Sequence, residues 1–353
     1  MKIKLAILEK DAVYLGRIVN VFGTRYAEKF QIYSFTEPEV AMATLANTRM
    51  DVILVSDEFD LNPEKLPRRC GFAYFVDSPD IDTLNGQKTI CKFQKADLIY
   101  KQILSIHSEN AGYLSDIKFG DDHGKLLVFQ SVSGGAGASS MAAACAMHIA
   151  KKGMRALYLN LETFGASDVF FEGPGRESMS DVIYAVKSKK YNLAMKLESS
   201  VKQDESGVYF YSQPELALNM MEFTPEEILR LVTEIQLTGK FDYIIADTEF
   251  SLHPEALKLC RKANALVWVG EGSEVSNTKL SRAAQVLRQL EENEDYPLTN
   301  RLALIYNKFS NKTNQVLSDA GIKNIGGAPR YEHASAKDVL MHLSGMEMFD
   351  KLM

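Results

Sequence analysis

Short apolar runs alternate with longer amphipathic stretches along the first hundred or so residues. The runs are rich in β-branched side chains, which predicts strands, and the stretches carry apolar residues at helical spacing. The expected strands are 3–8, 31–35, 52–56, 72–76 and 89–92, and the expected helices are 12–26, 38–47 and 95–105. This βα series predicts a small doubly wound sheet.

A second and longer series of the same kind begins near residue 124. Its strand candidates are almost entirely apolar, which predicts a parallel sheet covered by helices on both faces. The expected strands are 126–130, 156–161, 208–211, 243–247, 265–269 and 302–306, and the clearest helices are 139–151, 225–237, 254–261 and 277–291. The predicted fold class is therefore α/β, with two doubly wound domains and a mostly parallel sheet in the larger one.

A polar, glycine-containing stretch, SENAGYLSDIKFGDDHG, separates the two series. Apolar periodicity fades there, which is typical of a linker. We therefore expect a first domain at 1–107, a linker at 108–123 and a second domain at 124–353. A chain of 353 residues also exceeds what one hydrophobic core usually serves.

Composition and charge argue against several function classes. The net charge is −6 and no stripe of Lys and Arg is evident, which argues against a nucleic-acid partner. No run approaches the roughly 18 consecutive apolar residues that a membrane span needs, and the N-terminus lacks the apolar core of a signal peptide. The four cysteines show no paired spacing, so we expect reduced thiols and a cytoplasmic protein.

A glycine-rich turn joins the strand at 126–130 to the helix at 139–151. It consists of Ser133, Gly134, Gly135, Ala136, Gly137, Ala138, Ser139 and Ser140. Glycines let successive backbone N–H groups point inward, and the helix adds its positive end, which together predict an anion-binding nest. Ser139 or Ser140 supplies the hydroxyl that a P-loop uses to hold Mg²⁺, whereas Ala138 takes the place of its lysine.

This turn resembles the deviant P-loop of MinD, ParA and related ATPases, which reads KGGxGK[ST]. The alignment puts Ser133 at the signature lysine and Ala138 at the P-loop lysine, so both lysines are missing. For the turn alone, an ordinary strand-to-helix connection remains the alternative. A dinucleotide-binding loop is a further alternative, but it needs another glycine near Ser140.

Three later segments resemble the same ATPases in the right order: LYLNLETFGASD, FDYIIADTEF, and LALIYNKFS with the GGAPRYEHASAKD loop. The resemblance implies that Glu162 positions an attacking water and that Asp247 holds the Mg²⁺ water shell together with Ser139. It also implies that Asn307, at the end of the late strand, contacts adenine, and that the loop with Pro329 and Arg330 closes over the base. Lys308, next to Asn307, is a further cofactor-binding candidate.

The missing lysines carry a cost. A charge about 4 Å from a phosphate contributes roughly 4 kcal/mol at an effective dielectric of 20, before desolvation. Positive groups at a transferring phosphoryl contribute on the order of 10³ to 10⁵ in rate. We therefore expect ATP and Mg²⁺ as cofactors, with very slow or no hydrolysis. An active ATPase is the alternative, and it needs a substitute cation such as Lys125, Lys308 or Arg330.

The first domain resembles a response-regulator receiver domain. A receiver places acids after its first strand, a phosphoacceptor Asp after the third, a hydroxyl after the fourth and a Lys after the fifth. The matching positions here hold Glu9, Asp11, Asp57, Ser78 and Lys92.

This receiver match is partial. Lys10 lies within the acidic cluster, where its charge opposes a divalent cation, and the strand register leaves either Ser56 or Asp57 at the acceptor position. A receiver-shaped module that only makes contacts and a phosphorylatable receiver both remain open.

Together the two domains resemble the TadZ/CpaE family of Flp (tight-adherence) pilus assembly proteins. The resemblance implies a nucleotide-gated localisation factor at a cell pole or the inner face of the membrane, which recruits the pilus secretion machinery including its traffic ATPase. It also implies a homodimer, here without the lysine that crosses between subunits. The alternatives are an active ParA/MinD-like ATPase in spatial positioning and a two-component, receiver-regulated protein. The apolar tail at 338–353 predicts a helix packed on the core, with a membrane-surface helix as its alternative.

Overall fold

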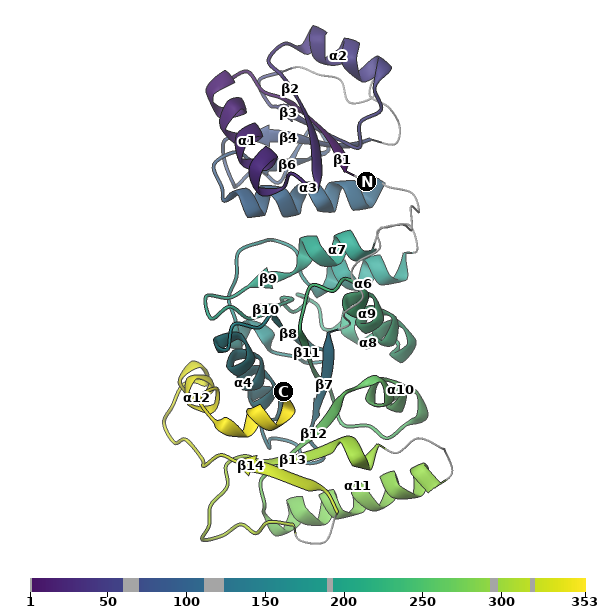
Figure 1. Ribbon diagram of the computed structural model, residues 1–353, viewed down its shortest axis with the longest axis vertical. Coiled ribbons are helices and arrows are strands. Elements are labelled where there is room, and N and C mark those ends of the chain that lie inside the picture. The colour runs from purple at the N-terminus through teal and green to yellow at the C-terminus, as the bar shows by residue number, and fades with distance from the viewer. Residues whose placement is uncertain (1, 60–69, 111–123, 189–192, 293–297, 318–320) are drawn as a thin grey trace. The chain divides into compact units, whose positions relative to one another are not determined.

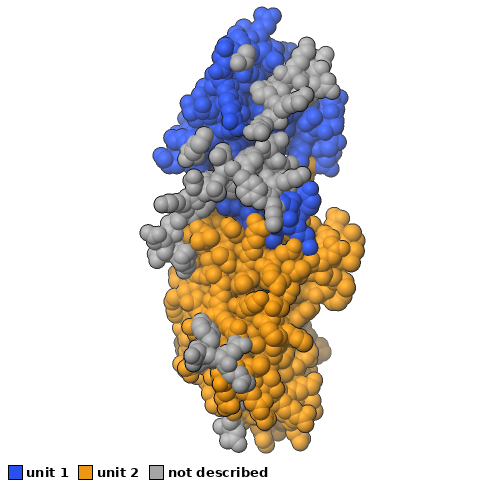
Figure 2. Space-filling view, turned by 90° about the vertical axis from the view of Figure 1, so that its right-hand side faces the viewer, with its two compact units in different colours: residues 1–118, 184–200 blue, residues 119–183, 201–353 orange. Residues whose placement is uncertain are grey.

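The computed structural model describes residues 2–59, 70–110, 124–188, 193–292, 298–317 and 321–353 (Figure 1). These residues form two compact units (Figure 2). Unit 1 comprises Met1–Lys118 and Tyr184–Ser200, and unit 2 comprises Phe119–Ile183 and Val201–Met353. The α/β fold class predicted from the sequence is confirmed in both units.

Unit 1 contains a six-stranded sheet in the order β2-β1-β3-β4-β6-β5. Its strands are β1 (Ile3–Leu8), β2 (Phe30–Phe35), β3 (Val52–Ser56), β4 (Gly71–Val76), β5 (Thr83–Leu84) and β6 (Gln87–Cys91). Its helices are α1 (Ala12–Arg25), α2 (Pro38–Asn47), α3 (Ala96–Asn110) and α7 (Leu193–Ser200). All strands are parallel except β5, which forms a hairpin with β6. The parallel strands have the order of flavodoxin-like doubly wound sheets.

The alternation of side chains along β1 fills a core on each face of this sheet. Leu5 and Ile7 belong to one buried cluster, which also contains Ile103 of α3. Leu8 belongs to the cluster on the other face with Ala41 of α2. Successive strand residues point to opposite faces, so a fully apolar strand requires helices on both sides.

Helix α7 completes unit 1 although it comes from the second half of the sequence. Met195 joins the buried cluster on the α3 side of the sheet. The buried ammonium of Lys196 donates to Ser105 Oγ at 3.0 Å, and Tyr100 donates its phenol hydrogen to Glu198 at 2.7 Å. The structure groups Tyr184–Ser200, which were expected in the second domain, with unit 1, because α7 packs mainly against α3. Of the expected linker, residues 108–110 end α3, and residues 111–123 lie outside the described residues.

Unit 2 contains an eight-stranded sheet in the order β14-β13-β12-β7-β11-β8-β10-β9. The strands are β7 (Lys125–Gln130), β8 (Ala156–Asn160), β9 (Lys202–Gln203), β10 (Tyr209–Phe210), β11 (Tyr243–Asp247), β12 (Ala265–Gly270), β13 (Leu302–Tyr306) and β14 (Lys323–Gly327). The pairings are parallel except that between β9 and β10. From β7 the chain crosses to β8 on one side of β7, and it later returns to β12 on the other side. The topological switch point, where doubly wound proteins bind ligands, therefore lies at the carboxyl end of β7.

Helices surround this second sheet. They are α4 (Ala138–Lys151), α5 (Ser167–Phe170), α6 (Met179–Lys187), α8 (Leu218–Met221), α9 (Pro225–Leu237), α10 (Pro254–Lys262), α11 (Glu274–Glu292) and α12 (Ala336–Leu343), with 3-10 turns at η2 (Thr299–Arg301) and η3 (Glu347–Leu352). Among the described residues, no helix is long and apolar enough to cross a lipid bilayer.

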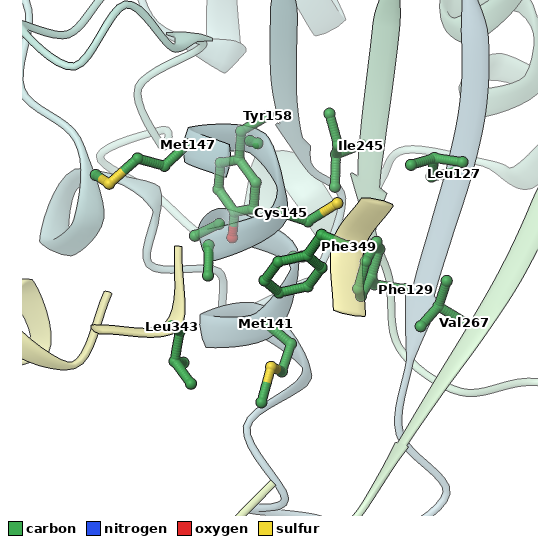
Figure 3. Close-up of a cluster of buried hydrophobic side chains, with 14 of the residues drawn as sticks. Leu127, Phe129, Met141, Cys145, Met147, Tyr158, Ile245, Val267, Leu343 and Phe349 are labelled. Atoms are coloured by element: carbon green, nitrogen blue, oxygen red, sulfur yellow. The ribbon is translucent and has the colours of Figure 1, made fainter. Parts of the chain in front are cut away.

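Helix α4 lies at the centre of the unit 2 core. Its Met141 and Cys145 pack with Phe129 of β7 and with Phe349 of η3 (Figure 3). Phe349 is completely buried, and His148 of α4 contacts the carbonyl oxygen of Ser344 at 3.0 Å. The apolar tail is therefore part of this core, as expected for a helix packed on the core.

Candidate nucleotide site

The turn between β7 and α4 presents backbone amides at the switch point of the sheet. Gly135 and Gly137 have φ angles of 79° and 87°, in the left-handed region that glycine adopts without strain. Gly137 is the N-cap of α4 and supplies no side-chain cap. In the described part of the chain, the amides of Gly134 and Gly135 donate no hydrogen bond. The loop therefore offers open N–H groups beside a helix N-terminus, as an anion-binding nest requires.

The two lysine positions of the P-loop pattern hold side chains that point into the protein. Ala138 is buried in the core cluster around α4. Ser133 is buried as well, and its hydroxyl donates to Ser276 Oγ of α11 at 3.3 Å. Neither position can supply a positive charge. Ser140 is half-buried in the first turn of α4, next to Ser139.

Two consecutive residues after β13 bind the carbonyl oxygens of this loop. Asn307 is buried, and its Nδ2 donates to Ala136 O at 2.8 Å. Lys308 Nζ donates to Gly135 O at 2.5 Å. A Cβ atom on Gly137 would lie 2.4 Å from Asn307 Nδ2, so only glycine fits there. In this structure Asn307 therefore fixes the shape of residues 133–140, the candidate phosphate-binding loop, called the phosphate loop below.

Asp247, the last residue of β11, is completely buried at the same end of the sheet. Its Oδ2 accepts hydrogen bonds from Tyr158 at 2.8 Å and from Asn160 at 3.1 Å. Among the described residues, no hydrogen bond reaches Oδ1. Burial and the nearby Glu162 raise the pKa of Asp247 to about 7, although the hydroxyls of Tyr158 and Ser139 partly oppose that rise.

Glu162 links the loop after β8 to the phosphate loop. Ser139 donates its hydroxyl hydrogen to Glu162 Oε2 at 3.1 Å, and the backbone amide of Glu162 donates to Asn160 Oδ1 at 3.0 Å. Burial raises the pKa of Glu162, and repulsion by Glu249 adds to this. Ser139, Glu162 and Asp247 thus form one polar cluster beside the nest.

The loop after β14 runs beside the loop after β13. Ala328 N donates to Tyr306 O at 2.8 Å, and Phe309 N donates to Ala328 O at 2.9 Å. Pro329 and Arg330 follow directly and are exposed. The structure therefore brings the predicted base-binding segments together at the carboxyl edge of the sheet.

Sequence reasoning did not assign roles to three polar residues of this site. Tyr158 and Asn160 hold Asp247, and Gln130 donates to Thr248 Oγ1 at 3.0 Å and to Glu249 O at 3.1 Å. Asn160 and Gln130 both end apolar strands. A polar residue at the carboxyl end of a buried strand is the signal that points to them.

The donor set fits a nucleotide with a magnesium ion. The open amides suit phosphate oxygens. A buried carboxylate oxygen and a serine hydroxyl are the hard oxygen groups that hydrated Mg²⁺ prefers. The unsatisfied Oδ1 of Asp247 is the observation that favours a cation, because a buried polar atom normally has a partner.

The receiver-like pocket of unit 1 contains a buried lysine with its own counter-ions. Lys92 Nζ lies 3.1 Å from Glu9 Oε2 and 3.2 Å from Asp77 Oδ1, and it donates to Ser56 Oγ at 3.2 Å. Burial lowers the pKa of Lys92, but the contacts with Glu9 and Asp77 outweigh burial and raise it. Ser56 and not Asp57 therefore reaches the lysine.

The remaining predicted receiver residues lie around this pocket rather than in it. Asp57 is exposed, and its amide continues the β3–β4 pairing. Asp11 caps α1 by accepting hydrogen bonds from Val13 and Tyr14. Ser78 accepts from the amide of Asp80 at 3.2 Å in the turn after β4.

Comparisons with known proteins give a family for the first hundred or so residues and a fold for the second unit. Residues 1–108 match the family described as TadZ-like, receiver domain. A ParA family ATPase from Chlorobium tepidum TLS is 22% identical over 65% of this chain and 97% of its own, with a TM-score of 0.51. The cell division ATPase MinD from Pyrococcus furiosus is 15% identical over 65% of this chain and 100% of its own, with a TM-score of 0.47. No curated protein matches significantly. The ParA comparison shows the fold of the second unit.

Proposed function

We propose that this chain binds ATP and acts as an assembly factor. Its architecture, a TadZ-like receiver domain followed by a ParA-like unit, is that of the TadZ/CpaE family. The observation that carries the proposal is the phosphate loop, whose open amides lie beside Ser139 and the buried Asp247. The loop residues 133–140 would hold the phosphates, and Ser139 and Asp247 would hold hydrated Mg²⁺. Asn307, Pro329 and Arg330 would lie at the base, and Lys308 would contact the nucleotide from the end of β13.

Hydrolysis is expected to be very slow or absent. Bound Mg²⁺ supplies charge to the phosphate oxygens, but neither Ser133 nor Ala138 adds the positive side chain that stabilises a transferring phosphoryl. Glu162 is the only candidate we assign for orienting a water, and its hydroxyl partner is Ser139. The nucleotide would therefore act as a stable switch rather than as a fuel.

Calorimetric titration with Mg·ATP tests the binding proposal. We expect measurable affinity in the wild type and weaker affinity in Asp247→Ala. The absence of heat and affinity at millimolar nucleotide would reduce unit 2 to a nucleotide-free scaffold. A phosphate-release assay tests the second part: rapid turnover that is lost in Glu162→Ala and Asp247→Ala would instead identify an active ATPase.

We also infer that ATP favours a homodimer, held by surface contacts without a lysine that crosses between subunits. Light scattering with and without Mg·ATP tests this, and a monomer under both conditions contradicts it. In cells, the dimer is proposed to act at a pole or the inner membrane face, where it recruits the Flp pilus secretion machinery and its traffic ATPase. A fluorescent fusion that stays diffuse, and pili that assemble normally without the chain, would contradict that role.

A further inference from the structure

The phosphate loop needs a positive charge that its own sequence does not supply. Lys125, Lys308 and Arg330 are the candidate substitutes. Lys125 begins β7, whereas the loop follows Gln130 at its other end, roughly 16 Å away at about 3.3 Å per residue. The Lys125 ammonium instead contacts Met353 O at 2.6 Å. Lys125 therefore cannot serve the site.

Arg330 lies on the exposed segment after β14, where the sequence places the loop that closes over a base. Lys308 differs because its ammonium already touches the phosphate loop, at Gly135 O. Gly135 is exposed at the tip of that loop, and its amide is one of the open donors. Of the three cations, only Lys308 contacts the nest directly in the described structure.

The backbone also directs Lys308 toward the loop. Its φ angle is 56°, a left-handed conformation that is uncommon for a residue with a side chain. Asn307, the preceding residue, is fixed by its bond to Ala136 O. The anchored asparagine and the reversed backbone after it together bring the Lys308 ammonium over Gly135. Strained residues of this kind cluster at ligand sites.

A carboxylate marks where an anion would sit against this ammonium. Glu271, which follows β12, places Oε1 3.7 Å from Lys308 Nζ. Both side chains are about one-third exposed, so an incoming anion can replace Glu271. An ammonium has three N–H donors, so it can keep Gly135 O and still bind a phosphate oxygen.

We propose that Lys308 is a phosphate-binding residue that supplies, from the end of β13, a positive charge for holding the bound nucleotide, and that Glu271 is the counter-ion the phosphate replaces. This charge serves binding and does not replace the two missing lysines at the transferring phosphoryl. The inference rests on the proposed nucleotide binding and adds its electrostatic basis. It places the cation at the end of β13 rather than at position 138, the first residue of α4, where the usual P-loop lysine would be.

Calorimetric titration of the full chain with Mg·ATP tests the assignment. Lys308→Gln keeps a donor for Gly135 O but removes the charge, so we expect at least a roughly tenfold loss of affinity and a weaker salt dependence. Lys308→Arg should retain most of the affinity, and Glu271→Gln should bind more tightly than the wild type. Lys312→Gln, at an exposed lysine of the following turn, is the control with the same change in net charge.

A purely structural role for Lys308 makes a different prediction. In that case Lys308→Gln would bind Mg·ATP like the wild type, and the assignment would be overturned. Equal losses in Lys308→Gln and Lys312→Gln would also overturn it, since they would reflect net charge alone. If the wild type bound no nucleotide, the proposed function would fail together with this inference, whereas binding that ignores Lys308 would sink only the inference.

Discussion

Tyr158 donates its phenol hydrogen to Asp247 across 2.8 Å, and both residues are completely buried. The contact joins the middle of β8 to the carboxyl end of β11, and the two strands lie next to each other in the sheet. A buried carboxylate without such donors is costly. Tyr158 and Asn160 therefore hold Oδ2, whereas Oδ1 has no hydrogen-bond partner among the described residues.

Tyr158→Phe should destabilise the protein by about 1–3 kcal/mol, because the buried Asp247 Oδ2 loses one of its two donors. Thermal unfolding measures this as a lower Tm. Tyr209→Phe is the control, since it removes a phenol hydroxyl from a half-buried position of strand β10 in the same unit. Equal Tm values for the two variants would show that the Tyr158 hydrogen bond contributes nothing.

Gly137→Ala should abolish or strongly weaken Mg·ATP binding. The added Cβ would lie 2.4 Å from Asn307 Nδ2. The alanine would also have to adopt a φ of 87°, which costs about 1–3 kcal/mol, so the loop can accept the substitution only by changing its conformation. Gly134→Ala is the matched control, because no atom lies within 4 Å of its Cβ position and its φ is not in the left-handed region. Calorimetry should separate the two, and similar affinities would contradict the importance of this loop geometry.

Met195→Asp should detach α7 from α3. It places a charge in the apolar cluster of unit 1, and loss of a buried methionine alone costs about 2–5 kcal/mol. Amide hydrogen exchange should then accelerate in α3 around Ile103, while Val40→Asp, at an exposed position of α2, should leave it unchanged. Unchanged exchange in Met195→Asp would mean that α7 contributes little to unit 1.

The stability of unit 1 should fall as the pH drops below about 6.5, the ordinary histidine pKa. Burial lowers the pKa of His107, although Asp51 partly opposes it. The His107 imidazole of the folded state then binds a proton more weakly than that of the unfolded state. The free energy of unfolding is therefore unaffected above the pKa of the unfolded state, and it decreases as the pH falls from that pKa to the lower pKa of the folded state. His107→Gln should flatten this dependence in urea unfolding at several pH values, and His253→Gln, at an exposed residue, should not.

Acetyl phosphate should not label Asp57. The carboxylate is exposed, and Lys92 is paired with Glu9 and Asp77 and bound to Ser56, so no cation of this pocket is directed at Asp57 in the described structure. Mass spectrometry after incubation with acetyl phosphate and Mg²⁺ checks this. A phosphate adduct that disappears in Asp57→Asn would restore the phosphorylatable reading.

The sheets could be predicted well because their strands are continuous apolar runs. The bounds expected for 3–8, 52–56, 243–247 and 302–306 agree with β1, β3, β11 and β13. The edge strands β5 and β9 could not be predicted, because each has only two residues and neither residue is buried. Gly-rich β14 was missed for a similar reason, because KNIGG carries almost no β-branched signal.

The site was only partly readable for a different reason. The glycine turn and the acids at strand ends are local patterns, so Gly137, Glu162 and Asp247 could be selected from sequence. The bond from Asn307 to Ala136 O spans distant segments, and no local pattern encodes it. Likewise, whether Ser56 or Asp57 points into the receiver-like pocket depends on the alternation of side chains along β3. The contact between Ser56 and Lys92 shows which one does, and the sequence alone does not encode it.

The position of α7 in the chain bears on synthesis. The receiver-like unit needs residues up to Ser200, which follow the first strands and the phosphate loop of unit 2. A ribosome adding about 5–20 residues per second must therefore begin the second sheet before the first unit can close. Until then the side of α3 that α7 covers, with Tyr100 and Ile103, stays open to solvent or chaperones. The folding of the first unit is therefore coupled to the synthesis of the second.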